Sequence, residues 1–141
     1  MDVTQIPFNH FLGIQQAAQD SGCLLELGDS PSYTNHLGTV HASVQLALAE
    51  ASSGEFLLRT LPEFGNQVLA VVRRVEAKFK NPMRGKIRSR AVTSETELKQ
   101  SAEALATKNR AILPVTIEIV DADGAAGLVV TFEWFAQKQS G

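Results

Sequence analysis

The chain has 141 residues, of which 44% are hydrophobic and 20% are charged, and this is the composition of one globular domain with its own core. Its formal net charge of −2 at pH 7 excludes a global electrostatic attraction to nucleic acid or to an anionic membrane. We therefore expect a single domain over residues 1–141 with neither nucleic acid nor membrane as a partner.

Cysteine content and hydropathy predict a cytoplasmic location. Cys23 is the only cysteine, so an intrachain disulfide is impossible and a reducing compartment is expected. The N-terminal residues lack the basic and apolar regions of a signal peptide. Charged and polar residues interrupt the apolar stretch at 40–61, which argues against a membrane span.

The first predicted elements precede a long loop. Phe8, Phe11 and Leu12 form a partial helical stripe, and Pro7 suits a first turn, so we predict a short helix over residues 7–19. Residues 23–27 are predicted to form a short strand, and residues 28–38 a loop.

The longest predicted helix spans residues 40–61. Apolar side chains occur on nearly all of its sides, which is typical of a buried helix. Gly54 lies in its interior, where glycine costs about 1 kcal/mol relative to alanine. A glycine at this position suggests close approach by another group, either a ligand or a second chain. Leu61 followed by Pro62 ends the helix.

Strands dominate the remainder of the chain. Residues 67–80 form a long predicted strand, and after a turn at 81–85 the chain returns over residues 86–92 as the second strand of a hairpin. A helix is predicted over residues 95–108, and residues 111–120 and 128–137 form a second hairpin. Pro114 indicates an edge position or a bulge. This order predicts an α+β fold in which a strongly curved antiparallel sheet wraps around one central helix.

Glu50 is the most informative residue of the predicted central helix. It lies among Leu46, Ala47, Leu48, Ala49 and Ala51, where a carboxylate is costly unless it is paired or used. Such a carboxylate can have a raised pKa and can act as an acid, a base or a nucleophile. The alternative is a structural carboxylate that is hydrogen-bonded at a dimer interface.

The element order and a motif around the central helix resemble the hotdog fold and, within it, the phenylacetyl-CoA and 4-hydroxybenzoyl-CoA types of acyl-CoA thioesterase. Asn35 lies in the loop before the helix, and Glu50 follows it by fifteen positions, as in those families. His41-Ala42 stands where they have His-Gly. The resemblance covers residues 5–138. It implies hydrolysis of an acyl-CoA thioester to a free acid and CoA, at a site shared by two subunits of a homodimer or tetramer. It implies no cofactor beyond the CoA of the substrate, and no Cys or His spacing suggests a metal site.

The resemblance also implies a role for each residue. Glu50 acts as general base or nucleophile, the first helical N–H groups near His41 and Ala42 hold the thioester oxygen, and Asn35 orients water or substrate. The structural alternatives are a loop or capping role for Asn35 and a bracing role for His41. Ala42 adds a methyl group where the family has glycine, which favours a second function, a non-catalytic acyl-CoA-binding or regulatory protein. A third function, a hotdog dehydratase or hydratase, would need a different His and acid motif, which is not found.

Basic residues are concentrated in one part of the chain. Residues 73–90 contain eight of the thirteen Lys and Arg residues. We interpret part of this segment as a phosphate-binding edge for the nucleotide end of CoA, formed by Arg84, Lys86, Arg88 and Arg90. The alternative is a charged, solvated strand face that discourages aggregation.

Overall fold

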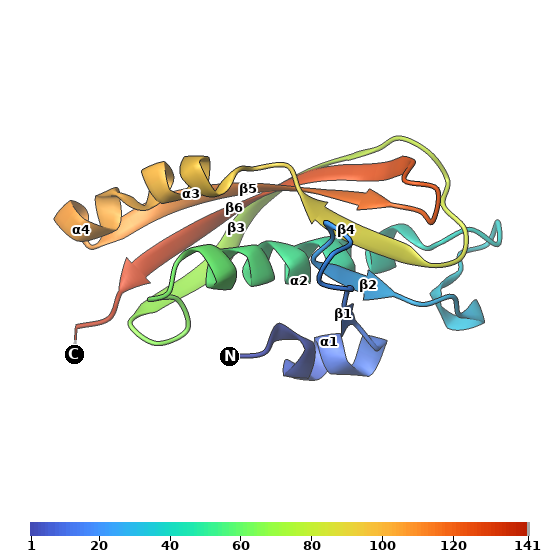
Figure 1. Ribbon diagram of the computed structural model, residues 1–141, viewed down its shortest axis with the longest axis horizontal. Coiled ribbons are helices and arrows are strands. Elements are labelled where there is room, and N and C mark those ends of the chain that lie inside the picture. Colours follow the sequence, from blue (N-terminus) through green and yellow to red (C-terminus); the bar gives the residue numbers. More distant parts are fainter. Residues whose placement is uncertain (141) are drawn as a thin grey trace.

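The computed structural model describes residues 1–140 and contains one sheet, one long helix and several short helices (Figure 1). The helices are η1 (Val3–Gln5), α1 (Pro7–Leu12), η2 (Pro31–Tyr33), α2 (Ala42–Thr60), α3 (Glu95–Ala102) and α4 (Ala104–Lys108). The strands are β1 (Gln15–Gln16), β2 (Leu25–Leu27), β3 (Val68–Phe79), β4 (Ile87–Ala91), β5 (Arg110–Val120) and β6 (Ala126–Lys138). Among the described residues, no helix is both long enough and apolar enough to cross a membrane.

The six strands form one antiparallel sheet in the order β1-β2-β4-β5-β6-β3, and α2 lies against its concave face (Figure 1). The segment η1–α1 contacts α2, and in the view of Figure 1 it lies on the side of this helix away from the sheet. Helices α3 and α4 contact β5. The architecture therefore confirms the predicted α+β fold, a curved sheet wrapped around a central helix.

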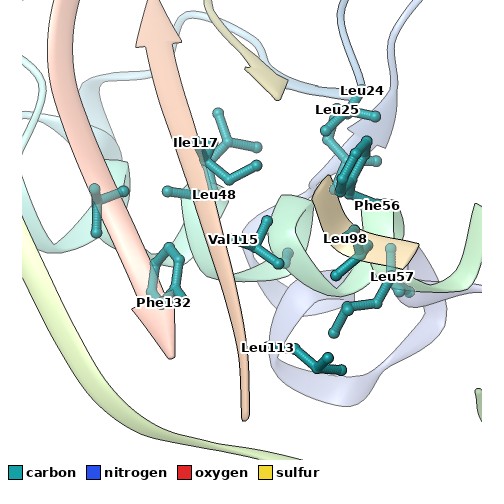
Figure 2. Close-up of a cluster of buried hydrophobic side chains, with 14 of the residues drawn as sticks. Leu24, Leu25, Leu48, Phe56, Leu57, Leu98, Leu113, Val115, Ile117 and Phe132 are labelled. Atoms are coloured by element: carbon teal, nitrogen blue, oxygen red, sulfur yellow. The ribbon is translucent and has the colours of Figure 1, made fainter. Parts of the chain in front are cut away.

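The core lies between α2 and the inner face of the sheet. Leu48, Phe56 and Leu57 of α2 meet Val115 and Ile117 of β5 and Phe132 of β6, all buried (Figure 2). Leu98 of α3 is also fully buried and lies near Phe56 and Leu57. Strict alternation along β5 and β6 places one apolar row on this face, and its burial is the main stabilising contribution to the fold.

The first helix is shorter than predicted. It ends at Leu12 because Gly13 adopts a left-handed conformation, with φ 81°, and its N–H caps the carbonyl groups of Asn9 and His10. Residues 15–16 are then extended and pair with β2. Similarly, the helix predicted over residues 95–108 consists of two helices, which meet at Glu103.

A bulge in β3 interrupts the simple alternation of side chains along this strand. Strict alternation would place Leu69, Val71 and Val75 together, but the pairing with β6 shifts between Val72 and Arg74. The register then puts one set of side chains on the inner face of the sheet: Val68, Ala70, Val72, Val75, Ala77 and Phe79. The extra residue keeps the inner face apolar along the whole strand and directs Arg74, Glu76 and Lys78 outward.

The hairpin predicted between residues 67–80 and 86–92 is wrong. Strand β3 pairs with β6 at one edge of the sheet, whereas β4 lies between β2 and β5. The segment after β3 therefore crosses to the other side of the sheet instead of turning back. The hairpin of β5 and β6 is confirmed, and Pro114 lies in the first half of β5, where β4 does not reach. Pro114 thus occupies an edge position, as predicted.

Candidate active site

The start of α2 presents one free backbone donor. His41 is the N-cap residue, and its Nδ1 accepts a hydrogen bond from the Ser43 N–H at 3.0 Å. The His41 N–H donates to the Tyr33 carbonyl at 2.8 Å. The Ala42 N–H, by contrast, makes no hydrogen bond within residues 1–140. Of the two predicted oxyanion donors, Ala42 is therefore the one with an available N–H, at the positive end of the helix dipole.

Asn35 holds together the loop before α2. Its Oδ1 accepts hydrogen bonds from the backbone N–H groups of Leu37, at 2.9 Å, and Thr39, at 3.1 Å. Its Nδ2 donates to Thr39 Oγ1 at 2.9 Å. These bonds correspond to the structural alternative for Asn35, a loop-forming side chain. One amide hydrogen of Asn35 remains for a substrate or water, so the predicted orienting role stays a prediction.

An open hollow of about 300 Å³ lies beside this loop and the start of α2. Asn35 and Ala42 line it, together with Gln45 and with residues 79–82 at the end of β3. Gln45 is 4% exposed, and its Nε2 donates to the Val40 carbonyl, while its Oε1 has no hydrogen-bond partner within the described residues. This Oε1 has almost no exposed surface, so it is a buried acceptor and not one that is open to the hollow. Sequence reasoning missed Gln45, although its place one turn after the helix start was a usable signal.

Glu50 lies on an exposed face of α2, which corrects the expectation of a fully buried helix. We call this face the open stripe; it consists of Ser43, Leu46, Ala47, Glu50, Gly54 and Leu58, all exposed or half-buried. Their spacing of three or four residues aligns them along the helix. The buried carboxylate of α2 is instead Glu55, which is 8% exposed and paired with Arg59 at 2.6 Å.

The carboxylate of Glu50 is electrostatically unusual despite its exposure. Partial desolvation by the surrounding protein raises the pKa of Glu50 above that of an ordinary glutamate. The other members of the open stripe are neutral, and no cation among the described residues forms an ion pair with Glu50. A carboxylate in such surroundings is well suited to accept a proton or to attack an electrophile.

A single chain does not bring Glu50 and Ala42 together. The two residues lie eight positions apart in the same helix, which corresponds to about 12 Å along its axis at about 1.5 Å per residue. Asn35 lies at the Ala42 end, beside the hollow. The structure thus groups Asn35, His41 and Ala42 at one place and leaves Glu50 at another.

The four predicted CoA-binding residues lie on β4 and the segment before it, in the middle of the sheet instead of at an edge. Lys86 pairs with Glu26 at 3.1 Å, and Arg90 pairs with Glu118. Arg84 donates a hydrogen bond to the Gly38 carbonyl. Arg88 forms no ion pair with a described residue. Arg84 and Arg88 are therefore the members of this set without a carboxylate partner. Among residues 1–140, no group of three His, Cys, Asp or Glu side chains is arranged to hold a metal ion.

Solved structures with the same arrangement of helices and strands define the fold class. A probable thioesterase from Pseudomonas aeruginosa has 18% identity and a TM-score of 0.81, over 97% of this chain and 91% of that chain. A thioesterase from Haemophilus influenzae has 15% identity and a TM-score of 0.68, over 99% and 88%. A Bacillus halodurans protein crystallised with CoA has 21% identity and a TM-score of 0.59, over 79% and 65%. The chain therefore has the hotdog fold.

The family is defined by sequence. Residues 8–135 match the family described as Domain of unknown function (DUF4442), and the chain belongs to this family. No curated protein sequence matches the chain.

Proposed function

We propose that this protein hydrolyses acyl-CoA thioesters, with Glu50 as the catalytic carboxylate. The observation that carries the proposal is the position of Glu50, a carboxylate of raised pKa in an otherwise uncharged open stripe on the central helix of a hotdog fold. Thioesterases among the solved structures with this fold support the reaction class. A Bacillus halodurans protein crystallised with CoA supports a CoA-type substrate.

The proposed site is built by two chains. Because about 12 Å separates Glu50 from Ala42 within one helix, the two residues act on one thioester only if they come from different subunits. Two surfaces support such a dimer. The open stripe exposes apolar side chains, and β3 is an edge strand whose inner-facing Val75 and Phe79 are 48% and 46% exposed. Two-fold symmetry then forms the site twice, each time from the Ala42 end of one chain and the partner's Glu50.

Each group has a defined task in the proposed reaction. The ionised Glu50 either removes a proton from water, which then attacks the thioester carbon, or attacks this carbon itself to form an anhydride that water hydrolyses. The Ala42 N–H donates a hydrogen bond to the carbonyl oxygen as it becomes negatively charged. The carbon–sulfur bond breaks, and CoA leaves as a thiol or thiolate. Arg84 and Arg88 are proposed to bind CoA phosphates because neither has a carboxylate partner among the described residues. Lys86 and Arg90 would first have to leave the carboxylates with which they pair.

The test measures thiol release from a panel of acyl-CoA esters with a thiol reagent. We expect Glu50→Gln to lower kcat/KM by about 10²–10⁴-fold while the protein remains folded. Glu103→Gln, at an exposed glutamate between α3 and α4, is the matched control and is expected to keep wild-type activity. Hydrolysis that survives Glu50→Gln would refute the assignment.

The shared site has its own test. Ala47 is half-buried on the open stripe next to Glu50, so Ala47→Arg is expected to disrupt the dimer by placing a charge in its interface. Light scattering after size-exclusion chromatography should give a dimer for the wild type and a monomer for the variant. Activity should disappear with the dimer, and a fully active monomer would contradict the two-chain site.

The second candidate function is acyl-CoA binding without hydrolysis, and Ala42 is the observation that favours it. The side chain of Ala42 lines the hollow where the thioester oxygen would approach the helix end. A thermal stabilisation of the wild-type protein by CoA esters without release of free thiol would support this function over hydrolysis.

A further inference from the structure

We propose that an apolar cavity beside the second half of α2 receives the acyl chain of the substrate, so that the protein acts on thioesters of apolar acids whose acyl group carries no carboxylate or hydroxyl. This inference rests on the proposed function, because it assigns the acyl part of the same substrate. It extends that function by naming the class of acyl group and the residues that select it.

The lining of the cavity determines what it accepts. The cavity is open on one side and has a volume of about 240 Å³. No charged side chain lines it; the walls include Gly54, Leu58, Phe64, Val68, Ala70 and Trp134. A lining of this kind favours aliphatic and aromatic groups over acyl groups that carry a carboxylate or hydroxyl.

The cavity begins one helical turn after the candidate catalytic carboxylate. Gly54 follows Glu50 by four positions on the open stripe, so the two residues are neighbours on the helix surface. Ser53 connects them further: its Oγ donates to the Glu50 carbonyl at 2.7 Å and accepts the Trp134 Nε1–H at 3.0 Å. The indole N–H therefore has a hydrogen-bond partner, and the ring carbons of Trp134 face Gly54.

Gly54 keeps this cavity open. A Cβ atom at Gly54 would lie 3.9 Å from the Trp134 ring, which is an ordinary contact, so nothing within the chain requires glycine there. The predicted close approach at Gly54 is therefore not made by another part of the chain. We infer that the missing side chain leaves room for a ligand, since glycine is otherwise unfavourable inside a helix. In the proposed dimer the thioester carbon lies at Glu50, so the CoA part extends from there toward the Asn35 and Ala42 hollow of the other subunit.

The first experiment measures kcat/KM for straight-chain acyl-CoA esters from acetyl to dodecanoyl and for benzoyl-CoA. For wild type, each methylene that enters the cavity is expected to raise kcat/KM about fourfold until the cavity is full. Gly54→Leu should lower the ratio of kcat/KM for the longest good substrate to kcat/KM for acetyl-CoA at least tenfold, while light scattering still gives a dimer. Gly54→Ala, which fits without a clash, should cause a smaller loss of the same kind. Ala106→Leu, on the exposed face of α4, adds the same side chain away from the cavity and should change nothing.

The second experiment does not depend on hydrolysis. Trp134 is the only tryptophan of the chain, so its fluorescence reports directly on the cavity. In the Glu50→Gln background, decanoyl-CoA should change the emission and bind more tightly than acetyl-CoA, and Gly54→Leu should abolish this difference. Equal effects of Gly54→Leu on all chain lengths, or fluorescence that does not depend on chain length, would overturn the inference. Absence of hydrolysis in the wild type with the fluorescence response intact would refute only the proposed function.

Discussion

Ser89→Ala tests how α2 is attached to the sheet. Ser89 Oγ accepts a hydrogen bond from the Leu25 N–H at 3.1 Å and another from Ser52 Oγ of α2 at 2.5 Å. All three residues are fully buried. Alanine removes the acceptor of the Leu25 N–H, and a buried donor without a partner costs about 1–3 kcal/mol. We therefore expect Ser89→Ala to lower the free energy of unfolding by about 1–3 kcal/mol.

Ser52→Ala is the matched control because it removes the other end of the same hydrogen bond. The single hydroxyl hydrogen of Ser52 is shared between Ser89 Oγ and the Leu48 carbonyl, which lies 2.6 Å away, and loss of this hydroxyl leaves Ser89 with both of its contacts to Leu25. No buried donor is orphaned, so the expected cost is below about 1 kcal/mol. Urea unfolding at one fixed protein concentration measures both variants, with an unchanged m-value as the condition for comparison. A cost for Ser52→Ala that equals or exceeds that of Ser89→Ala would refute this reasoning.

Three further predictions concern packing, capping and pH. In Gly127→Ala the new Cβ would clash with the Sδ of the buried Met83, so we expect a loss of about 1–3 kcal/mol in urea unfolding, less when Met83→Ala is also present. Ser94→Ala removes the capping box of α3, where Ser94 Oγ accepts the Glu97 N–H at 3.1 Å, and should cost about 1 kcal/mol in the same assay. Because the pKa of Glu50 is raised and its ionised form is the reactive one, kcat/KM should fall with decreasing pH through a value above that of an ordinary glutamate. The same raised pKa means that Glu50 adds stability below its unfolded-state pKa, and that this stability is lost as pH rises through the folded-state value. Glu50→Gln should abolish both pH dependences, and persistence of either would contradict the assignment.

Local patterns predicted most of the elements because each is specified by nearby residues. The alternation along residues 111–120 and 128–137, with a turn between them, defined the hairpin of β5 and β6. The bulge in β3 was not predictable from periodicity, since Leu69 and Val75 differ by an even number of positions and alternation places them together. In the structure the two residues face opposite ways, because one extra residue in β3, at the bulge opposite β6, turns Val75 inward to join the apolar face.

Sheet neighbours were harder to predict than strands. The segment at 81–85 contains Pro82 and Gly85, which are typical of a tight turn, and so a hairpin was expected. The structure instead uses this segment as a crossing, in which the Met83 side chain is buried against Gly127 and its carbonyl accepts the Val40 N–H at 2.8 Å. These long-range contacts involve residues about 40 positions away, and turn propensity carries no information about them. The same crossing separates the basic residues of β3 from those on and before β4, because the two strands are not neighbours in the sheet.

The candidate site shows a similar division between local and long-range information. The helix start was expected near His41 and Ala42 from residues adjacent in sequence, and α2 begins at Ala42 with His41 as its N-cap. The exposure of Glu50 was not, because its apolar sequence neighbours Leu48, Ala49 and Ala51 point to other sides of the helix and fill the core of the same chain. The buried carboxylate of α2 is Glu55, which is neutralised by Arg59. Glu50 instead occupies the side of α2 that its own sheet does not cover, so the chemistry proposed for it depends on what a second chain and a substrate place against that side.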